Sequence, residues 1–123
     1  MGTRAWMTPG GRSTNKIVNA GGGNALGRRG TLINVSGGAV VEEAAMVAAL
    51  EEGRVGWAGL DVFAAGPHVP EALRKLQNVV LLPHVGSATH ETRDAMGALT
   101  VDNLLQHLQD GTVISAVPEC ADM

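Results

Sequence analysis

One histidine, His84, is a residue whose type and position could support acid–base chemistry. It follows four consecutive apolar residues, Val79 to Leu82, and a proline. A short apolar run that begins with β-branched side chains and ends at a turn residue predicts a buried strand. Open α/β sheets bind ligands just beyond the carboxyl ends of their strands. The position of His84 therefore favours catalysis or ligand binding, and the alternative is a loop histidine bonded to backbone.

The other histidines and the single cysteine give no metal-ligand pattern. Zinc sites often show paired ligands such as H-x-x-x-H or C-x-x-C, and neither spacing occurs in this sequence. We therefore expect no metal site, and we interpret the remaining histidines as surface residues: His68, His90 and His107. Ser36 does not stand in a G-x-S-x-G motif, so a serine hydrolase is not expected either.

A run of three glycines at 21–23 suggests a phosphate-binding loop at first sight. The G-x-G-x-x-G fingerprint would need a glycine at position 26, which is Leu26, and a strong strand before the loop. Neither is present, so we interpret the run as a flexible linker. Each glycine inside a helix costs roughly 1 kcal/mol relative to alanine. We therefore expect a helix over this segment to be frayed or absent.

Apolar and turn residues alternate along the chain as in β-α units, whose crossovers favour parallel strands. The expected strands are 31–35, 55–63 and 79–82. The expected helices are one from Glu42 to Gly53, a short helical turn at 72–76 and a long amphipathic helix at 90–109. The predicted fold class is α/β, with a partial, Rossmann-like parallel sheet of about three strands.

Composition limits the possible functions. The 123 residues are 45% hydrophobic and 17% charged, with a net charge of −3 and no basic cluster, so neither nucleic acid nor an acidic membrane is an expected partner. The sequence contains no signal peptide and no apolar run of membrane-spanning length, and its one cysteine, Cys120, cannot form an intrachain disulfide. These features favour a cytoplasmic protein.

Three stretches together resemble one enzyme family. They read G-T-L-I-N-V-S-G-G-A-V-V-E-E at 30–43, G-W-A-G-L-D-V-F at 56–63 and N-V-V-L-L-P-H-V-G-S-A-T-H-E-T at 78–92. The chain resembles the D-isomer-specific 2-hydroxyacid dehydrogenases, and among them the glyoxylate and hydroxypyruvate reductases. The resemblance covers 14–117 and implies the later part of an NAD(P)-binding domain, after an irregular segment at 1–13 and before a tail at 118–123.

The resemblance implies roles for three positions of the catalytic site. His84, in P-H-V-G-S-A-T, matches the family's catalytic histidine, which protonates the substrate carbonyl. The family also has an arginine in N-x-S/A-R-G that holds the substrate carboxylate, and a glutamate in D-V-F-x-x-E-P that orients the histidine. These two positions are Gly37 and Gly66 here. We therefore expect little or no activity from this chain alone.

The cofactor is likewise implied by the resemblance. Asp61, in G-L-D-V, matches an aspartate that hydrogen-bonds the nicotinamide carboxamide, and four further residues match positions around the nicotinamide: Val35, Ser36, His84 and Gly86. The implied cofactor is NAD or NADP, and the residue that distinguishes them belongs to a part of the family that this resemblance does not cover. The pyrophosphate-binding part is not covered either, so we expect binding by this chain alone to be impaired.

The leading hypothesis is therefore an NAD(P)-dependent oxidoreductase, acting by resemblance on a small 2-oxo or 2-hydroxy acid, that is truncated and lacks the catalytic arginine and glutamate. One alternative is a non-catalytic interaction module that pairs with full-length relatives. The other is a gene fragment without a function. We separately expect the chain to be marginally stable or to form a homo-oligomer, because part of the sheet and of the shared core would be unpaired.

Overall fold

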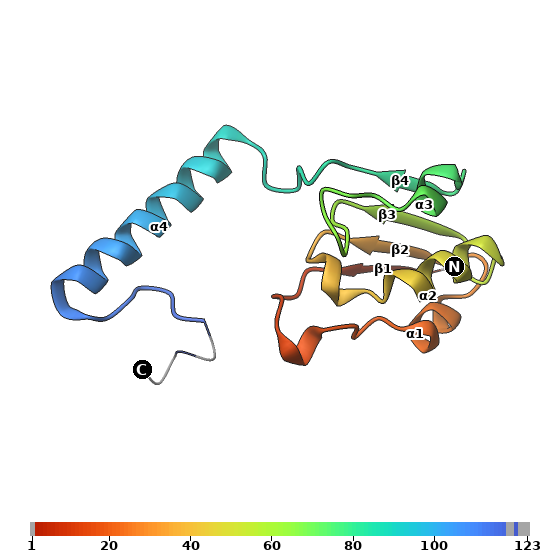
Figure 1. Cartoon of the computed structure of the whole chain (residues 1–123), viewed down its shortest axis with the longest axis horizontal. Coiled ribbons are helices and arrows are strands. Elements are labelled where there is room, and N and C mark those ends of the chain that lie inside the picture. The colour runs from red at the N-terminus through yellow and green to blue at the C-terminus, as the bar shows by residue number, and fades with distance from the viewer. Residues whose placement is uncertain (1, 118–119, 121–123) are drawn as a thin grey trace. The chain divides into compact units, whose positions relative to one another are not determined.

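The computed structural model describes residues 2–117 and 120, and Figure 1 shows its helices and strands. The chain divides into two compact units, residues 1–86 and 87–123. The expected domain at 14–117 therefore extends over both units. The expected tail at 118–123 lies outside the described residues except for Cys120.

The first unit contains a sheet of four parallel strands in the order β1-β2-β3-β4. The strands are β1 Thr3–Trp6, β2 Thr31–Asn34, β3 Trp57–Leu60 and β4 Val79–Leu81. The helices of this unit are α1 Ala20–Leu26, α2 Glu43–Glu51 and α3 Glu71–Lys75. The α/β class and the parallel sheet are confirmed.

Strand β1 lies in the segment 1–13 that we expected to be irregular, so the sheet has one strand more than predicted. It pairs with β2 in parallel, with Thr3 opposite Thr31 and Trp6 opposite Asn34. Its first three residues are exposed, so their side chains carry no alternating apolar pattern. Backbone pairing with β2 defines this strand, and side-chain periodicity could not reveal it.

One face of the sheet in the first unit forms the core. Burial alternates along β2 and β3, where Leu32 lies opposite Ala58 and Asn34 lies opposite Leu60. Helix α1 packs against α2 and β2, and α3 packs against β4. The buried core residues are Val18, Leu32, Val40, Val41, Met46, Ala49, Leu50, Val55, Ala58, Leu60 and Leu73.

The expectation that β4 would be a buried strand is only half right. Val79 and Leu81 pack against the core, whereas Val80 is 63% and Leu82 46% exposed. Successive side chains of a strand point to opposite faces of the sheet, so Val80 and Leu82 lie on the face away from the core.

Helix α1 forms over the glycine run, where we expected a frayed or absent helix. The side chain of Asn19 caps its amino end by accepting hydrogen bonds from the backbone N–H groups of Gly21 at 3.0 Å and Gly22 at 3.3 Å. Gly23 is buried, and a Cβ there would lie 3.6 Å from a methyl group of Val55, which is ordinary contact. Capping and packing thus offset part of the cost of the glycines.

The second unit contains α4, His90–Asp110, which confirms the long helix predicted at 90–109. Thr89 caps its amino end by accepting a hydrogen bond of 3.2 Å from the N–H of Thr92, and Gly111 ends it with a φ of 80°. None of its residues is buried. Within the described part of the chain, no helix combines the length and apolar character needed to cross a membrane.

Candidate functional site

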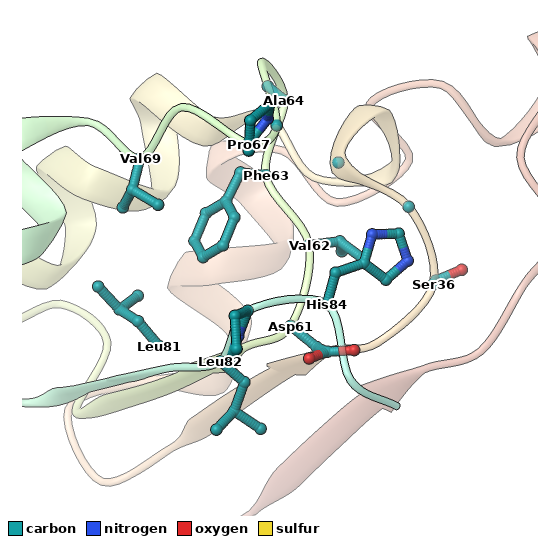
Figure 2. Close-up of a pocket in the computed structure, with 14 residues that line it drawn as sticks. Ser36, Asp61, Val62, Phe63, Ala64, Pro67, Val69, Leu81, Leu82 and His84 are labelled. Atoms are coloured by element: carbon teal, nitrogen blue, oxygen red, sulfur yellow. The ribbon is translucent and has the colours of Figure 1, made fainter. Parts of the chain in front are cut away.

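A pocket of about 780 Å³ lies in the first unit, beyond the carboxyl ends of β2, β3 and β4 (Figure 2). Its walls come from the loops that follow these three strands. The residues that line it are Ser36, Gly37, Gly38, Asp61, Val62, Phe63, Ala64, Gly66, Pro67, Val69, Leu81, Leu82, Pro83 and His84. This is the part of an open α/β sheet where ligands bind.

The carboxylate of Asp61 connects two of these loops. Asp61 follows β3 and is only 2% exposed. Its Oδ1 accepts a hydrogen bond from the N–H of Val85, and its Oδ2 accepts one from the N–H of Gly86, each at 2.7 Å. A buried carboxylate needs such donors because burial without them would disfavour its charged form. The hydrogen bonds join the end of β3 to the loop after β4.

His84 lies in that loop, exposed, with a φ of 59°. The N–H of Leu82 donates to the carbonyl of Leu60 at 2.8 Å, so the pairing of the two strands continues to within two residues of the histidine. In Figure 2 the imidazole points towards the side of the pocket that carries Ser36, and the ring of Phe63 lies on the other side. The histidine is therefore available to a molecule in the pocket.

The loop after β2 is held by a second buried polar side chain, Asn34, which is 1% exposed. Its Oδ1 accepts a hydrogen bond of 3.1 Å from the N–H of Ser36, and its Nδ2 donates to the carbonyl of Gly37 at 3.1 Å. The hydroxyl of Ser36 in turn donates to the carbonyl of Thr8, in the loop after β1. This side of the pocket is thus fixed by polar contacts to backbone.

The loop after β3 approaches the loop after β2 very closely. A Cβ at Gly38 would lie 2.0 Å from the carbonyl oxygen of Phe63, so only glycine fits without movement of the backbone. The N–H of Ala64 donates a hydrogen bond of 3.0 Å to a carboxylate oxygen of Glu43 at the start of α2. These contacts fix the wall that contains Phe63.

Gly37 and Gly66, which the motif resemblance matches to the family's charged positions, both line the pocket, on different loops. A Cβ at Gly37 would have no neighbour nearer than 3.9 Å, and one at Gly66 would lie 3.6 Å from the carbonyl of Phe63. Both positions could therefore hold a side chain. Neither provides a charge, so the native pocket has no cation at position 37 and no carboxylate at position 66.

The structure brings some of the predicted site residues together and not others. Ser36, Asp61 and His84 line the pocket, whereas Val35 and Gly86 do not. Val35 is 41% exposed beside Ser36, and Gly86 contributes its N–H to Asp61. Sequence reasoning assigned no role to Asn34 or Phe63. Asn34 stands two residues before the turn residues Ser36-Gly37-Gly38, a signal that could have identified the first.

The first unit has a parallel sheet with a pocket beyond the carboxyl ends of its strands, which is the arrangement of ligand-binding domains of the open α/β class. Residues 5–86 match the family described as the NAD-binding domain of D-isomer specific 2-hydroxyacid dehydrogenases. The chain belongs to this family. The resemblance inferred from the sequence motifs is therefore confirmed, including the assignment to part of the NAD-binding domain.

Two curated relatives illustrate the similarity. Glyoxylate/hydroxypyruvate reductase A of Arabidopsis thaliana is 51% identical over 104 residues, which are 85% of this chain and 33% of the relative. Hydroxyphenylpyruvate reductase of Plectranthus scutellarioides is 51% identical over 111 residues, or 90% of this chain and 34% of the relative. The chain thus spans about a third of the length of these relatives.

Solved structures have the same fold. An NADPH-dependent glyoxylate/hydroxypyruvate reductase from Sinorhizobium meliloti, in complex with NADP and malonate, aligns with a TM-score of 0.88 and 50% identity. The alignment covers 95% of this chain and 37% of that one. D-mandelate dehydrogenase from Rhodotorula graminis aligns over 94% of this chain and 34% of its own, with a TM-score of 0.81 and 26% identity.

Proposed function

We propose that the pocket is the nicotinamide end of an NAD(P)-dependent 2-hydroxyacid dehydrogenase site, of the glyoxylate/hydroxypyruvate reductase type. One observation carries the proposal: His84, Asp61, Ser36 and the two glycines at the family's charged positions all line a single pocket. These residues come from three loops that are far apart in the sequence. Their convergence beyond neighbouring strand ends supports a common role in binding and catalysis.

The residues present fit a nicotinamide group. A carboxylate has about four lone-pair sites, and the hydrogen bonds to Val85 and Gly86 use one on each oxygen of Asp61. Asp61 can therefore also accept a hydrogen bond from the amide of the carboxamide. When bound, the cofactor would supply the hydride that reduces a 2-oxo acid. His84 would donate the proton that the carbonyl oxygen gains.

We further propose that this chain alone turns over 2-oxo acids at a negligible rate. Gly37 provides no cation for the substrate carboxylate, and Gly66 provides no carboxylate to orient the imidazole of His84. Among the described residues, the imidazole makes no hydrogen bond with other protein groups. General acid–base catalysis contributes roughly 10²-fold to 10⁴-fold only when the acid is held in place.

Two measurements on the purified chain test these proposals. Amide NMR spectra recorded with a large excess of NADH or NADPH, which compensates for the pyrophosphate-binding part that this chain does not cover, should shift at residues 34–38, 61–64 and 84–86. Pocket signals that stay unchanged even at saturating cofactor would contradict the nicotinamide assignment. Oxidation of either cofactor in the presence of glyoxylate or hydroxypyruvate should remain at the level of the blank. A rate that His84→Ala abolishes would contradict the proposed inactivity.

A second candidate function, an interaction module, is favoured by one observation on α4. Six apolar residues of this helix are between 45% and 73% exposed: Met96, Leu99, Val101, Leu104, Leu105 and Leu108. Exposed apolar patches of this kind mark interaction sites. Light scattering after size-exclusion chromatography should then give a mass above that of one chain, and Leu105→Glu with Leu108→Glu should reduce it. A monomer at all concentrations would contradict self-association, and failure to bind a purified full-length relative as well would contradict this candidate.

A further inference from the structure

We propose that Asp61 is a positioning residue that holds the loop bearing His84 through its backbone, and that it does so before any cofactor binds. The proposal deepens the proposed function and rests on it only in the assignment of His84 as the proton donor. This role of Asp61 differs from its proposed contact with the nicotinamide carboxamide, because the groups that Asp61 binds here are the backbone N–H groups of Val85 and Gly86.

The two hydrogen bonds have the geometry of a strong anchor. Each carboxylate oxygen accepts one N–H at 2.7 Å, and hydrogen bonds to an ionised group are shorter and stronger than neutral ones. Asp61 itself is fixed, because its N–H donates to the carbonyl of Asn34 and its side chain is buried. The anchor thus connects a rigid strand end to consecutive residues of the histidine loop.

The backbone of His84 needs such an anchor. Its φ of 59° lies in the left-handed region, which residues with side chains occupy only when surrounding contacts stabilise it. The two N–H groups bound by Asp61 belong to the next two residues along the chain. The backbone conformation sets the direction in which the His84 side chain leaves the chain, while its ring, which makes no hydrogen bond within the described part of the protein, can still rotate.

The space around Gly86 indicates how closely the loop is held. A Cβ at this position would lie 2.9 Å from Oδ2 of Asp61, closer than such contacts occur without movement. A side chain would therefore displace the carboxylate or the loop. The close approach gives a reason for glycine at position 86 that is independent of a contact with cofactor.

Asn34 provides a matched control one strand away. Like Asp61, it is a buried polar residue at the end of a strand whose side chain holds the backbone of a pocket loop. Its hydrogen bonds go to Ser36 and Gly37 rather than to the histidine loop. Loss of either side chain removes a buried polar anchor, but the loss of Asp61 should alter the surroundings of His84 more, because only Asp61 binds the backbone of the histidine loop.

The experiment compares Asp61→Asn, Asp61→Ala, Gly86→Ala and Asn34→Ala with the native chain by NMR, without cofactor or substrate. Three quantities are measured: the amide shifts of residues 85 and 86, their exchange protection, and the imidazole signals of His84. Asp61→Ala should lower the protection about tenfold or more and move the imidazole signals. Asp61→Asn should have an intermediate effect because it keeps one acceptor oxygen.

Gly86→Ala should reproduce the effect of Asp61→Ala on the imidazole, and Asn34→Ala should instead change the amides of residues 36 and 37. Unchanged imidazole signals in both Asp61→Asn and Gly86→Ala would overturn the proposal, even if Asp61→Ala failed to fold. Equal imidazole changes in Asn34→Ala would also overturn it, because the effect would then be a general loosening. Turnover and cofactor binding do not enter the readout, so the proposed function can fail without affecting this result.

Discussion

The backbone N–H of Asp61 donates a hydrogen bond of 3.0 Å to the carbonyl oxygen of Asn34. The two residues lie side by side at the ends of neighbouring strands, and both have buried polar side chains. Each side chain holds the backbone of a pocket loop. Strand pairing and these two polar groups therefore fix the loops that surround the pocket.

The first prediction concerns the close approach of the loops after β2 and β3. Gly38→Ala should lower the free energy of unfolding by about 2 kcal/mol or more, because its Cβ would lie 2.0 Å from the Phe63 carbonyl oxygen and backbone cannot move easily. Gly37→Ala should change it by about 0.5 kcal/mol or less, since its Cβ would have no neighbour within 3.9 Å. Urea denaturation followed by circular dichroism measures both, and equal losses would contradict the prediction.

The second prediction concerns the missing cation. Gly37→Arg should fold like the native chain, because position 37 has extended backbone and space for a side chain. It should bind malonate with a Kd of roughly 1 to 10 mM, equivalent to about −3 to −4 kcal/mol, and added salt should weaken the binding. NMR titration of the pocket amides measures the affinity. Gly37→Gln, which adds length without charge, should show no binding, and binding by that variant would argue against an ionic cause.

The third prediction concerns the cap of α1. Asn19→Ala should lower the free energy of unfolding by about 1 kcal/mol, because two backbone N–H groups in a glycine-rich helix lose their acceptor. Asn15→Ala, which changes an exposed asparagine before the helix, is the matched control and should have little effect. Thermal unfolding of the native chain and of both variants measures the loss of stability caused by each substitution. Equal melting temperatures for the Asn19→Ala and Asn15→Ala variants would show that the cap does not stabilise α1.

The fourth prediction concerns the carboxyl end of α4. The hydroxyl and the N–H of Thr112 donate to Oδ1 of Asp110 at 2.6 and 2.8 Å, and they lower the pKa of Asp110 below its ordinary value of 3.8. A lowered pKa in the folded state contributes stability above pH 3.8 that is lost as the pH falls through the folded value. Thr112→Val should therefore raise the pKa of Asp110 towards 3.8.

Carbon NMR of the Asp110 carboxyl group during an acid titration measures this pKa. Thr100→Val is the control, since the Thr100 hydroxyl donates to the carbonyl of Met96 within α4 and makes no contact with Asp110. The control should leave the Asp110 titration unchanged. A pKa that Thr112→Val does not alter would assign the shift to another cause.

Motifs and periodicity predicted the parts of the fold that local sequence determines. The long helix was evident because apolar residues from Ala95 to Leu108 recur at helical steps and Gly111 ends the pattern. Strand β1 was missed because Thr3 to Ala5 are exposed and only its pairing with β2 defines it. The hydrogen bonds between two strands that are far apart in the sequence cannot be predicted from the side chains of one strand alone.

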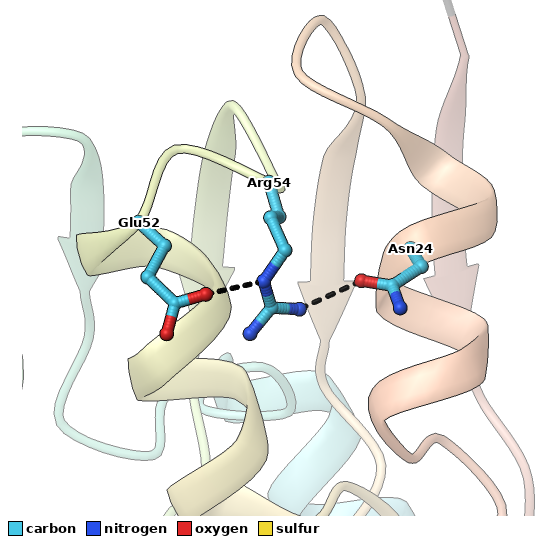
Figure 3. A network of polar contacts seen from close by, with 3 residues as sticks. All are labelled: Asn24, Glu52 and Arg54. Atoms are coloured by element: carbon cyan, nitrogen blue, oxygen red, sulfur yellow. Dashed lines mark hydrogen bonds and ion pairs between the residues drawn. The ribbon is translucent and has the colours of Figure 1, made fainter.

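Helix α1 was mispredicted for a related reason. Propensity counts the cost of three glycines but not the contacts that the helix gains elsewhere. Arg54 donates a hydrogen bond of 2.7 Å to the Oδ1 of Asn24 on α1, and its Nε lies 2.6 Å from a carboxylate oxygen of Glu52 (Figure 3). The helix is thus tied to the turn after α2, thirty residues along the chain.

At the site, the motifs identified Asp61 and His84 but could not show that the aspartate bonds to the backbone beside the histidine. That contact joins residues 24 and 25 positions apart and depends on the pairing of β3 with β4. The roles of Val35, Ser36, Gly86 and the two substituted glycines stay predictions. They are open to the experiments described above.

The order of the strands in the sheet is also their order along the chain. During synthesis on the ribosome, each strand after the first can therefore pair with the strand made just before it, and none has to insert between two strands already paired. Assembly in this direction adds every new strand at the most recently formed edge. The pocket draws its lining from the loops after β2, β3 and β4, so it stays incomplete until the loop that bears His84 has been made.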